Sequence, residues 1–194
     1  IGVLTAYLPS DRESMGYAAH LVWRNPKRPE HPEHRAARRR GQLPDVVRVA
    51  TVQYGQRRVK DFEEFATQVE FFIDVACDYG ADFVVFPELF TLQLLSIENR
   101  PLSPADSIRS LTSYTEPFCK LITELAVRFN VNLIAGSHPT QMPDGDIHNN
   151  CYVALRDGSL HVREKLHPTP NERHWWKIAG GDGAQIIQTD CGPI

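Results

Sequence analysis

The 194-residue sequence has no apolar run that approaches the roughly 18 residues needed to span a membrane. Its first residues lack the charged and then apolar pattern of a secretory signal. Its four cysteines are far apart and form no Cys-x-x-Cys motif, so neither a zinc site nor a disulfide framework is indicated. These absences predict reduced thiols, a cytoplasmic location, and no metal or other cofactor.

An excess of basic residues is also missing. Lys and Arg total 21 and Asp and Glu total 24, a formal net charge of -3, so nucleic acid is not an expected partner. Hydrophobic residues make up 42% and charged residues 23%, which are ordinary globular values and exclude disordered, collagen-like and coiled-coil classes. At roughly 100 to 200 residues per domain, the length allows one domain, or one domain with part of another.

The composition of the chain changes near residue 45. Residues 1–25 contain two short apolar segments and are predicted to be the end of an upstream domain. Residues 26–45 contain four prolines and several arginines but few large apolar side chains, which is typical of a solvated linker. The main domain is expected over residues 46–194. Because the chain begins inside one apolar run and stops as another starts, we expect it to be part of a longer protein.

Three short β-branched or apolar segments in the main domain are predicted to be buried strands. They cover residues 46–52, 83–86 and 131–135. A segment with helical periodicity lies between each successive pair. Alternation of strands and helices of this length favours crossover units and therefore an α/β sheet.

Both helical segments carry recognisable end signals. The first begins at Asp61 with Glu64 three residues later, which is a capping box, and Gly80 ends it. Apolar residues between these points fall at three- and four-residue spacing. The second helix is expected from about Pro117 to Asn130.

The later part of the chain has a different pattern. Residues 151–155 and 160–163 flank Asp157-Gly158, a two-residue hairpin signal, so antiparallel strands are expected to join the sheet. Residues 184–189 are predicted to form one more strand. The sheet is therefore expected to be mixed.

Glu88 is the first candidate site residue. It follows a predicted buried strand and has Phe86, Pro87, Leu89 and Phe90 around it. Ligands in open α/β sheets bind at the carboxyl ends of strands. Apolar surroundings disfavour a charged carboxylate and would raise its pKa toward a value useful for a general base. The alternative interpretation is a surface carboxylate at a strand end.

Lys165 is the second candidate, at the far end of the strand that begins at Leu160. An ammonium group there could stabilise a developing oxyanion. The alternative is that Lys165 is simply solvated, as most lysines are.

Five short segments, taken together, resemble successive motifs of the nitrilase superfamily, the carbon-nitrogen hydrolases. Their order and spacing match that family from about residue 46 to the end of the chain. The segments are Phe86-Pro-Glu-Leu-Phe90, Arg163-Glu-Lys-Leu-His167, Pro170-Asn-Glu172, Gly181-Asp182 and Thr189-Asp-Cys-Gly-Pro-Ile194.

This resemblance implies the first half of a nitrilase-like α-β-β-α sandwich and hydrolysis of a non-peptide amide or a nitrile through a Glu-Lys-Cys triad. Carried over by residue, Glu88 would be the general base and Lys165 the oxyanion-stabilising lysine. Glu172 would be a supporting glutamate that orients the lysine and the substrate. The nucleophilic cysteine of the family would lie just after Ile194, so residues 1–194 alone are expected to be inactive.

The cysteines of this chain fit the nucleophile role less well. Cys77, Cys119 and Cys151 fall within predicted helices or strands, and free cysteine is among the most buried residue types. We interpret them as packing residues. Cys191 is the one competitor, because it lies at a strand end, but it precedes the strand on which the resemblance places the nucleophile.

Other functions stay open at this stage. Residues 46–194 could be a noncatalytic nitrilase-like module for binding or assembly. The first 25 residues resemble, less specifically, the end of a GNAT-type acetyltransferase domain, so the chain could also be the regulatory part of an acetyltransferase fusion. The resemblance to nitrilases further implies a small-molecule substrate and a homo-oligomer for the full-length protein. The segment 91–101 is expected to be a loop that shapes the substrate pocket.

Overall fold

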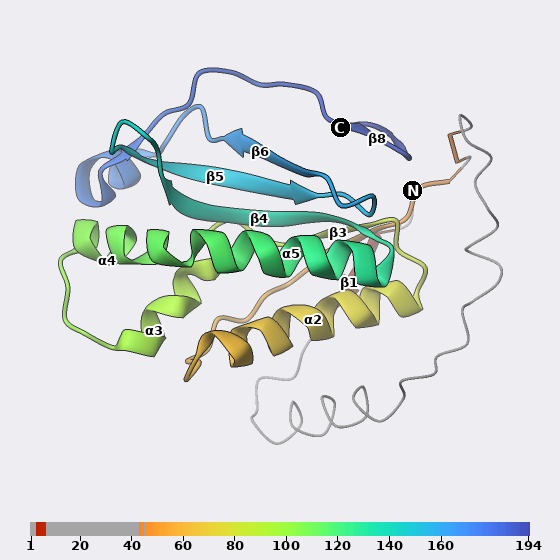
Figure 1. Cartoon of the computed structure of the whole chain (residues 1–194), viewed down its shortest axis with the longest axis horizontal. Helices are drawn as coiled ribbons and strands as arrows, with labels where there is room; N and C mark the ends of the chain where they lie inside the picture. Colours follow the sequence, from red (N-terminus) through yellow and green to blue (C-terminus); the bar gives the residue numbers. More distant parts are fainter. Residues whose placement is uncertain (1–2, 7–42, 45) are drawn as a thin grey trace.

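The computed structural model describes residues 3–6, 43–44 and 46–194. The described part contains a mixed sheet, helices and a small two-stranded hairpin (Figure 1). The strands of the sheet are β1 (Val3–Ala6), β2 (Val49–Val52), β3 (Phe83–Val85), β4 (Asn132–Gln141), β5 (Ile147–Ala154), β6 (Leu160–Glu164) and β7 (Ile178–Ala179).

The sheet has the strand order β1-β2-β3-β4-β5-β6, and β7 pairs with β5. Strands β1 to β4 are parallel to one another, whereas β5 is antiparallel to both β4 and β6. The predicted α/β class with a mixed sheet is therefore confirmed. The parallel strands need crossover connections, which helices supply, and the antiparallel strands are joined by short turns.

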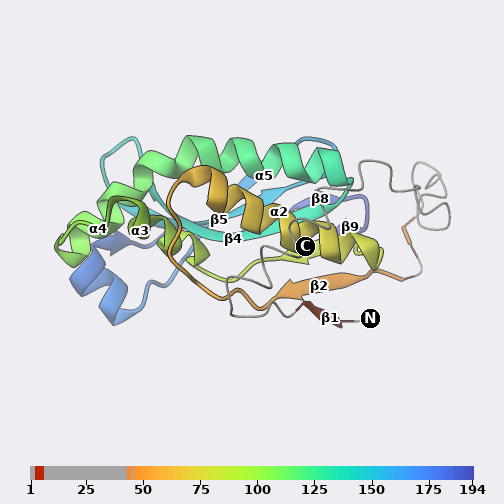
Figure 2. The ribbon, with the colours of Figure 1, turned by 90° about the horizontal axis from the view of Figure 1, so that it is seen from below.

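The two long helices and the helical segments between them cover one face of the sheet, whereas the blue helical turn of residues 172–176 lies at one end of it, as Figures 1 and 2 show. None of the helices in the described part of the chain is long and apolar enough to cross a lipid bilayer. The helical segments are α2 (Phe62–Asp78), η1 (Phe90–Leu94), α3 (Leu95–Glu98), α4 (Pro104–Leu111), η2 (Thr112–Tyr114), α5 (Thr115–Phe129) and η3 (Glu172–Trp176), which is a π-helix.

The two long helices begin and end close to the predicted positions. Asp61 caps α2 by accepting a hydrogen bond from the Glu64 N–H at 2.8 Å, and Gly80 follows the helix in the left-handed region. Asn130 ends α5 in the same left-handed conformation, which short polar side chains tolerate better than most. Between these ends α2 buries Phe65, Phe72 and other apolar side chains against the sheet.

The two faces of β5 bury different sets of side chains. Tyr152 and Ala154 belong to the main core between the sheet and the helices. Val153 lies on the opposite face, where it packs with Leu155 and Ile187. This alternation follows from the two-residue period of a strand. In Figure 1 the C-terminal segment passes over this second face.

Several elements differ from the sequence-based expectations. Within residues 184–189 only Gln188–Thr189 forms a strand, β8, and it pairs with β9 (Gly192–Pro193) in a separate hairpin and not with the main sheet. The segment 91–101, expected to be a loop, forms most of η1 and all of α3. Helix α4 has no counterpart in the predicted elements.

The proposed domain boundaries remain a prediction. Strand β1, which lies inside residues 1–25, pairs in parallel with β2 and so extends the same sheet. The rest of the predicted upstream remnant and almost all of the predicted linker 26–45 lie outside the described residues.

Gly136 creates an irregularity in β4 that matters for the site. The pairing of β4 with β5 shifts register between Ile134 and Ser137, and Gly136 lies within this bulge at φ 59°. A Cβ atom at Gly136 would overlap the carbonyl oxygen of Pro87. Glycine is therefore needed twice, for the left-handed backbone and for the close approach of the chain that precedes Glu88.

We expect Gly136→Ala to lower the free energy of unfolding by about 2 kcal/mol or more, because it combines backbone strain with an overlap against main-chain atoms. Urea unfolding followed by circular dichroism measures the change. Gly55→Ala is the control, since a Cβ there meets nothing within 4 Å. Equal stability of the two variants would contradict this account of the bulge.

Candidate active site

Glu88 is held by the residues on either side of it. Strand β3 ends three residues earlier, and Leu89 adopts a left-handed conformation at φ 53°. The Leu89 N–H donates to Ser137 Oγ at 3.0 Å, and its carbonyl accepts from Gln56 Nε2 at 3.3 Å. The chain around Glu88 is thereby attached to β4 and to the segment after β2.

Phe90 anchors the same segment in the core. Its ring is 1% exposed and lies within 6 Å, centroid to centroid, of Tyr54, Phe65, Phe86 and Phe118. Aromatic side chains bury much surface, and such ring pairs add stabilisation beyond the buried area. Glu88 therefore lies on a turn whose next two residues cannot move without disturbing the core.

Lys165 and Asn149 reach Glu88 from the neighbouring antiparallel strands. The Lys165 N–H donates to the Asn149 carbonyl at 3.0 Å, which continues the pairing of β5 with β6. Lys165 Nζ lies 2.7 Å from Glu88 Oε1, and Asn149 Nδ2 donates to the same oxygen at 2.9 Å. Because β3 and β4 are parallel and β5 returns beside β4, all three residues meet at one end of the sheet.

Glu172 completes the cluster from the first position of the π-helix η3. Its Oε2 lies 2.8 Å from Lys165 Nζ, and its Oε1 accepts from Asn149 Nδ2 at 3.1 Å. The side chain of Glu172 is 5% exposed, whereas that of Glu88 is 54% exposed. The lysine thus joins one buried and one accessible carboxylate, and the sequence candidates Glu88, Lys165 and Glu172 are all brought together.

The charges of this cluster stabilise one another. Burial favours the neutral form of Lys165, but hydrogen bonds and charges from Glu172 and Glu88 outweigh it, so the pKa of Lys165 is raised. Burial favours protonated Glu172, but the hydrogen bonds from Lys165, Thr169 and Asn149 outweigh it, so the pKa of Glu172 is lowered. Both groups are therefore held in their charged forms at neutral pH.

The surroundings of Glu88 differ from the expected apolar pocket. Its neighbours in sequence are apolar, but Phe86, Leu89 and Phe90 turn into the core and leave the carboxylate half exposed. Its contacts are the ammonium of Lys165 and the amide of Asn149. The apolar environment expected for Glu88 is therefore wrong, because flanking side chains need not face the same way as the one between them.

Asn149 was missed by the sequence argument. It is 1% exposed and its amide nitrogen bridges the two carboxylates. A signal was present, since two consecutive asparagines, Asn149 and Asn150, directly precede a segment predicted to be a strand. Buried amides are rare unless they hydrogen-bond, so such a pair at a strand start indicates a polar partner.

None of the four cysteines is bonded to this cluster. Cys191 Sγ lies 3.9 Å from Asn132 Nδ2 and 3.7 Å from Arg156 Nη2, at the first residue of β4, whereas Asn149 of the cluster pairs with Pro139 toward the other end of that strand. At about 3.3 Å per residue, the two places are roughly 20 Å apart along β4. Cys77 Sγ faces the Phe129 carbonyl at 3.9 Å. Burial raises the pKa of the Cys119 and Cys151 thiols, which disfavours thiolate.

His138 of β4 contacts two helical segments, η1 and α5. It is fully buried, and its Nδ1 and Nε2 lie 3.0 Å from Thr91 Oγ1 and 3.2 Å from Thr115 Oγ1. Its ring packs against Phe118. Burial lowers the pKa of His138 to about 4, so the imidazole is neutral at physiological pH.

This burial predicts acid sensitivity. An unfolded histidine has a pKa near 6.5, so between about pH 6.5 and pH 4 the unfolded state binds more protons and stability falls as pH falls. We expect His138 to account for about 3 kcal/mol of the stability lost over this range, from the difference between the two pKa values. Urea unfolding at pH 7 and pH 4 should show a smaller loss in His138→Gln than in the unchanged protein. The same loss in both would contradict the prediction.

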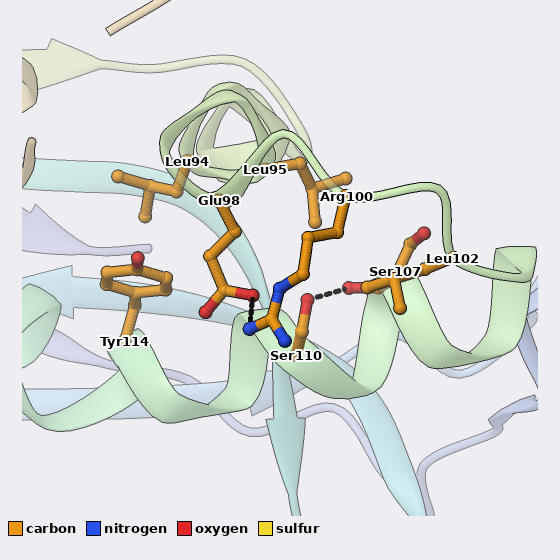
Figure 3. Close-up of a pocket in the computed structure, with 8 residues that line it drawn as sticks. All are labelled: Leu94, Leu95, Glu98, Arg100, Leu102, Ser107, Ser110 and Tyr114. Carbon is orange, nitrogen blue, oxygen red and sulfur yellow. Dashed lines mark hydrogen bonds and ion pairs between the residues drawn. The ribbon is translucent and has the colours of Figure 1, made fainter. Parts of the chain in front are cut away.

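A small hollow lies between η1, α3 and α4, as shown in Figure 3. Its volume of about 40 Å³ suits water more than a larger ligand. Glu98 and Arg100 form an ion pair across it, and Tyr114 closes one side (Figure 3). None of Glu88, Lys165 and Glu172 lines it, so the hollow is separate from the charged cluster.

The cluster can accept a proton and stabilise a negative charge. Among the described residues, both hydrogen bonds of Glu88 are made by Oε1, which leaves Oε2 available to an incoming proton. Lys165 supplies an ammonium group beside that carboxylate. Within the part of the chain that the structure describes, no three His, Cys, Asp or Glu side chains are grouped as metal ligands.

Comparisons with known proteins identify the family. The carbon-nitrogen hydrolase family profile matches residues 48–194. The chain belongs to this family, which is the nitrilase superfamily. It is 44% identical over 189 residues to "Probable hydrolase YhcX" of Bacillus subtilis (strain 168). That match covers 97% of this chain but 36% of the relative's length.

Solved structures share the fold. Nit3 of Saccharomyces cerevisiae, a member of branch 10 of the nitrilase superfamily, matches with a TM-score of 0.55 and 23% identity, over 71% of this chain and 50% of that one. An amidase from Nesterenkonia sp. AN1, with acrylamide added at its active-site cysteine, matches with a TM-score of 0.57 and 15% identity, over 73% and 53% of the two chains. The chain therefore spans about half the length of these structures.

Proposed function

We propose that the full-length protein is an amidase-type carbon-nitrogen hydrolase in which Glu88 is the general base, Lys165 stabilises the oxyanion and Glu172 supports the lysine. The observation that carries the proposal is the hydrogen-bonded cluster of these three side chains, with Glu88 Oε2 still available. Membership of the carbon-nitrogen hydrolase family supports it.

The first chemical step needs a base that a nucleophile can reach. A neutral thiol is a weak nucleophile, so Glu88 takes its proton and the thiolate attacks the carbonyl carbon of an amide. Over half of the Glu88 side chain is exposed, which supports this access. The proton taken from the thiol is then given to the leaving nitrogen as the carbon-nitrogen bond breaks.

Lys165 acts on the oxygen of the tetrahedral intermediate. Its ammonium is held charged by two carboxylates, so it offers a fixed positive charge where the negative charge develops. Water then attacks the thioester, with Glu88 accepting its proton. Release of the acid returns the thiol, and the cycle closes without a change in oxidation state.

The nucleophile in this proposal is a cysteine of the full-length protein that follows residue 194. The placement of the chain's own cysteines supports this, because Cys191 contacts Arg156 and Asn132 at the other end of the sheet. The amidase from Nesterenkonia sp. AN1 has an active-site cysteine, which agrees with a thiol as the nucleophile. The greater length of the relatives leaves room for it.

The substrate class is a small non-peptide amide or a nitrile. Screening short aliphatic amides, N-carbamoyl compounds and nitriles with the full-length protein, by ammonia release, tests this. Hydrolysis of a compound in this panel supports the proposal, and its absence for all of them would count against it.

The charged cluster is tested by two substitutions in the full-length protein. We expect Glu88→Gln to lower kcat by about 10² to 10⁴-fold and Lys165→Met by about 10² to 10³-fold, because they remove the base and the fixed positive charge. Glu124→Gln and Lys120→Met are matched controls from an exposed ion pair on α5. Wild-type kcat in either site variant, with the fold intact by circular dichroism, would overturn these roles.

The position of the nucleophile gives a separate prediction. Single Cys→Ser changes at Cys77, Cys119, Cys151 and Cys191 in the full-length protein should each leave kcat within about threefold of wild type. The thiols of Cys77 and Cys191 contact residues away from Glu88, and burial raises the pKa of the Cys119 and Cys151 thiols, which disfavours a nucleophilic thiolate. Complete loss of hydrolysis in one folded variant would identify that cysteine as the nucleophile instead.

A further inference from the structure

We infer that Thr169 is a positioning residue for the site, holding the Glu172 carboxylate against Lys165 through a capping box. The inference rests on the proposed function, since it gives Thr169 a role in catalysis through Glu172 and Lys165. Thr169 itself touches neither Glu88 nor Lys165 in any hydrogen bond of the described residues.

The contacts between Thr169 and Glu172 are reciprocal. The Glu172 N–H donates to Thr169 Oγ1 at 3.3 Å, and the Thr169 N–H donates to Glu172 Oε2 at 2.7 Å. The Arg173 N–H donates to the Thr169 carbonyl at 3.0 Å, which starts the helical turn. Thr-Pro-Asn-Glu over residues 169–172 is therefore a capping box in both sequence and geometry.

The carboxylate oxygen that completes the capping box, Glu172 Oε2, also contacts Lys165. Glu172 Oε2 accepts from the Thr169 N–H and lies 2.8 Å from Lys165 Nζ, while Oε1 accepts from Asn149. Both oxygens are thus occupied, and the side chain is 5% exposed. A carboxylate held at this many points has one orientation, and it fixes the ammonium group that depends on it.

Two other helix starts among the described residues have a cap of the same kind on one side only. Asp61 caps α2 and Ser103 caps α4, but Glu64 Oε2 accepts from the Lys60 N–H and Asp106 Oδ2 from the Ser103 hydroxyl, so neither carboxylate binds the N–H of its cap residue. The Ser103 cap is the closer match, because Pro104 follows Ser103 as Pro170 follows Thr169. The Asp106 N–H donates to Ser103 Oγ at 3.1 Å, and Ser103 Oγ lies 2.6 Å from Asp106 Oδ2.

The Ser103 cap contacts only its own helix start, whereas the carboxylate of the Thr169 capping box also contacts Lys165. No hydrogen bond or ion pair of the described residues joins Asp106 to Lys165 or Glu88. Loss of either hydroxyl should loosen one helix start by a similar amount. Only loss of the Thr169 hydroxyl should also disturb Lys165.

The test compares Thr169→Val with Ser103→Ala and Thr169→Ser in the full-length protein, using the amide with the highest kcat/KM in the panel. We expect Thr169→Val to lower kcat about five- to tenfold with KM changed less than twofold, because a cap is lost and the lysine is misplaced. Thr169→Ser should restore kcat to within about twofold of wild type. Ser103→Ala should lower the melting temperature similarly but leave kcat unchanged.

A crystal structure of Thr169→Val gives a second readout that needs no substrate. We expect the distance between Lys165 Nζ and Glu172 Oε2 to lengthen beyond hydrogen-bond range. An unchanged cluster together with unchanged kcat would overturn the role of Thr169, even if Glu88→Gln and Lys165→Met abolish hydrolysis. Activity that survives Glu88→Gln would instead overturn the proposed function, so the two failures are distinct.

Discussion

The contact on which the site depends is the ammonium of Lys165 between two carboxylates. Glu88 comes from the turn after β3, Lys165 from the end of β6, and Glu172 from the start of η3. Removing Lys165 would leave the buried Glu172 carboxylate without its cation and close to a second carboxylate, which is costly. The fold therefore stabilises Lys165 and Glu172 in the charged forms that the proposed mechanism uses.

The positions of Glu88 and Lys165 are set mainly by contacts of the neighbouring backbone. Before Glu88, the carbonyl of Pro87 packs against Gly136. After it come Leu89, in a left-handed conformation, and the buried Phe90. Lys165 continues a strand pairing through its own N–H. Such supports allow Glu88 to stay half exposed, and thus accessible, without losing its position.

Two parts of β4 have different contacts. In the middle of the strand, Ser137 contacts the turn that carries Glu88. At its first residue, Asn132 Nδ2 donates to Asp190 and the Arg156 side chain lies between Asp82 and Asp190, which attaches the β8-β9 hairpin to the sheet. Cys191 belongs to this second group, where its thiol contacts Asn132, Arg156 and Asp190.

The sequence alone determined the mixed α/β sheet and the two long helices, because periodicity and end signals are local properties, and its ordered motifs led to Glu88, Lys165 and Glu172 as candidates. Only the tertiary structure decided that Asn149 bridges the carboxylates, that Glu88 is half exposed, and that residues 188–189 leave the main sheet. These outcomes depend on which distant residues meet. Residues 88, 149, 165 and 172 come together through strand pairing across the sheet, and no short-range pattern encodes that proximity.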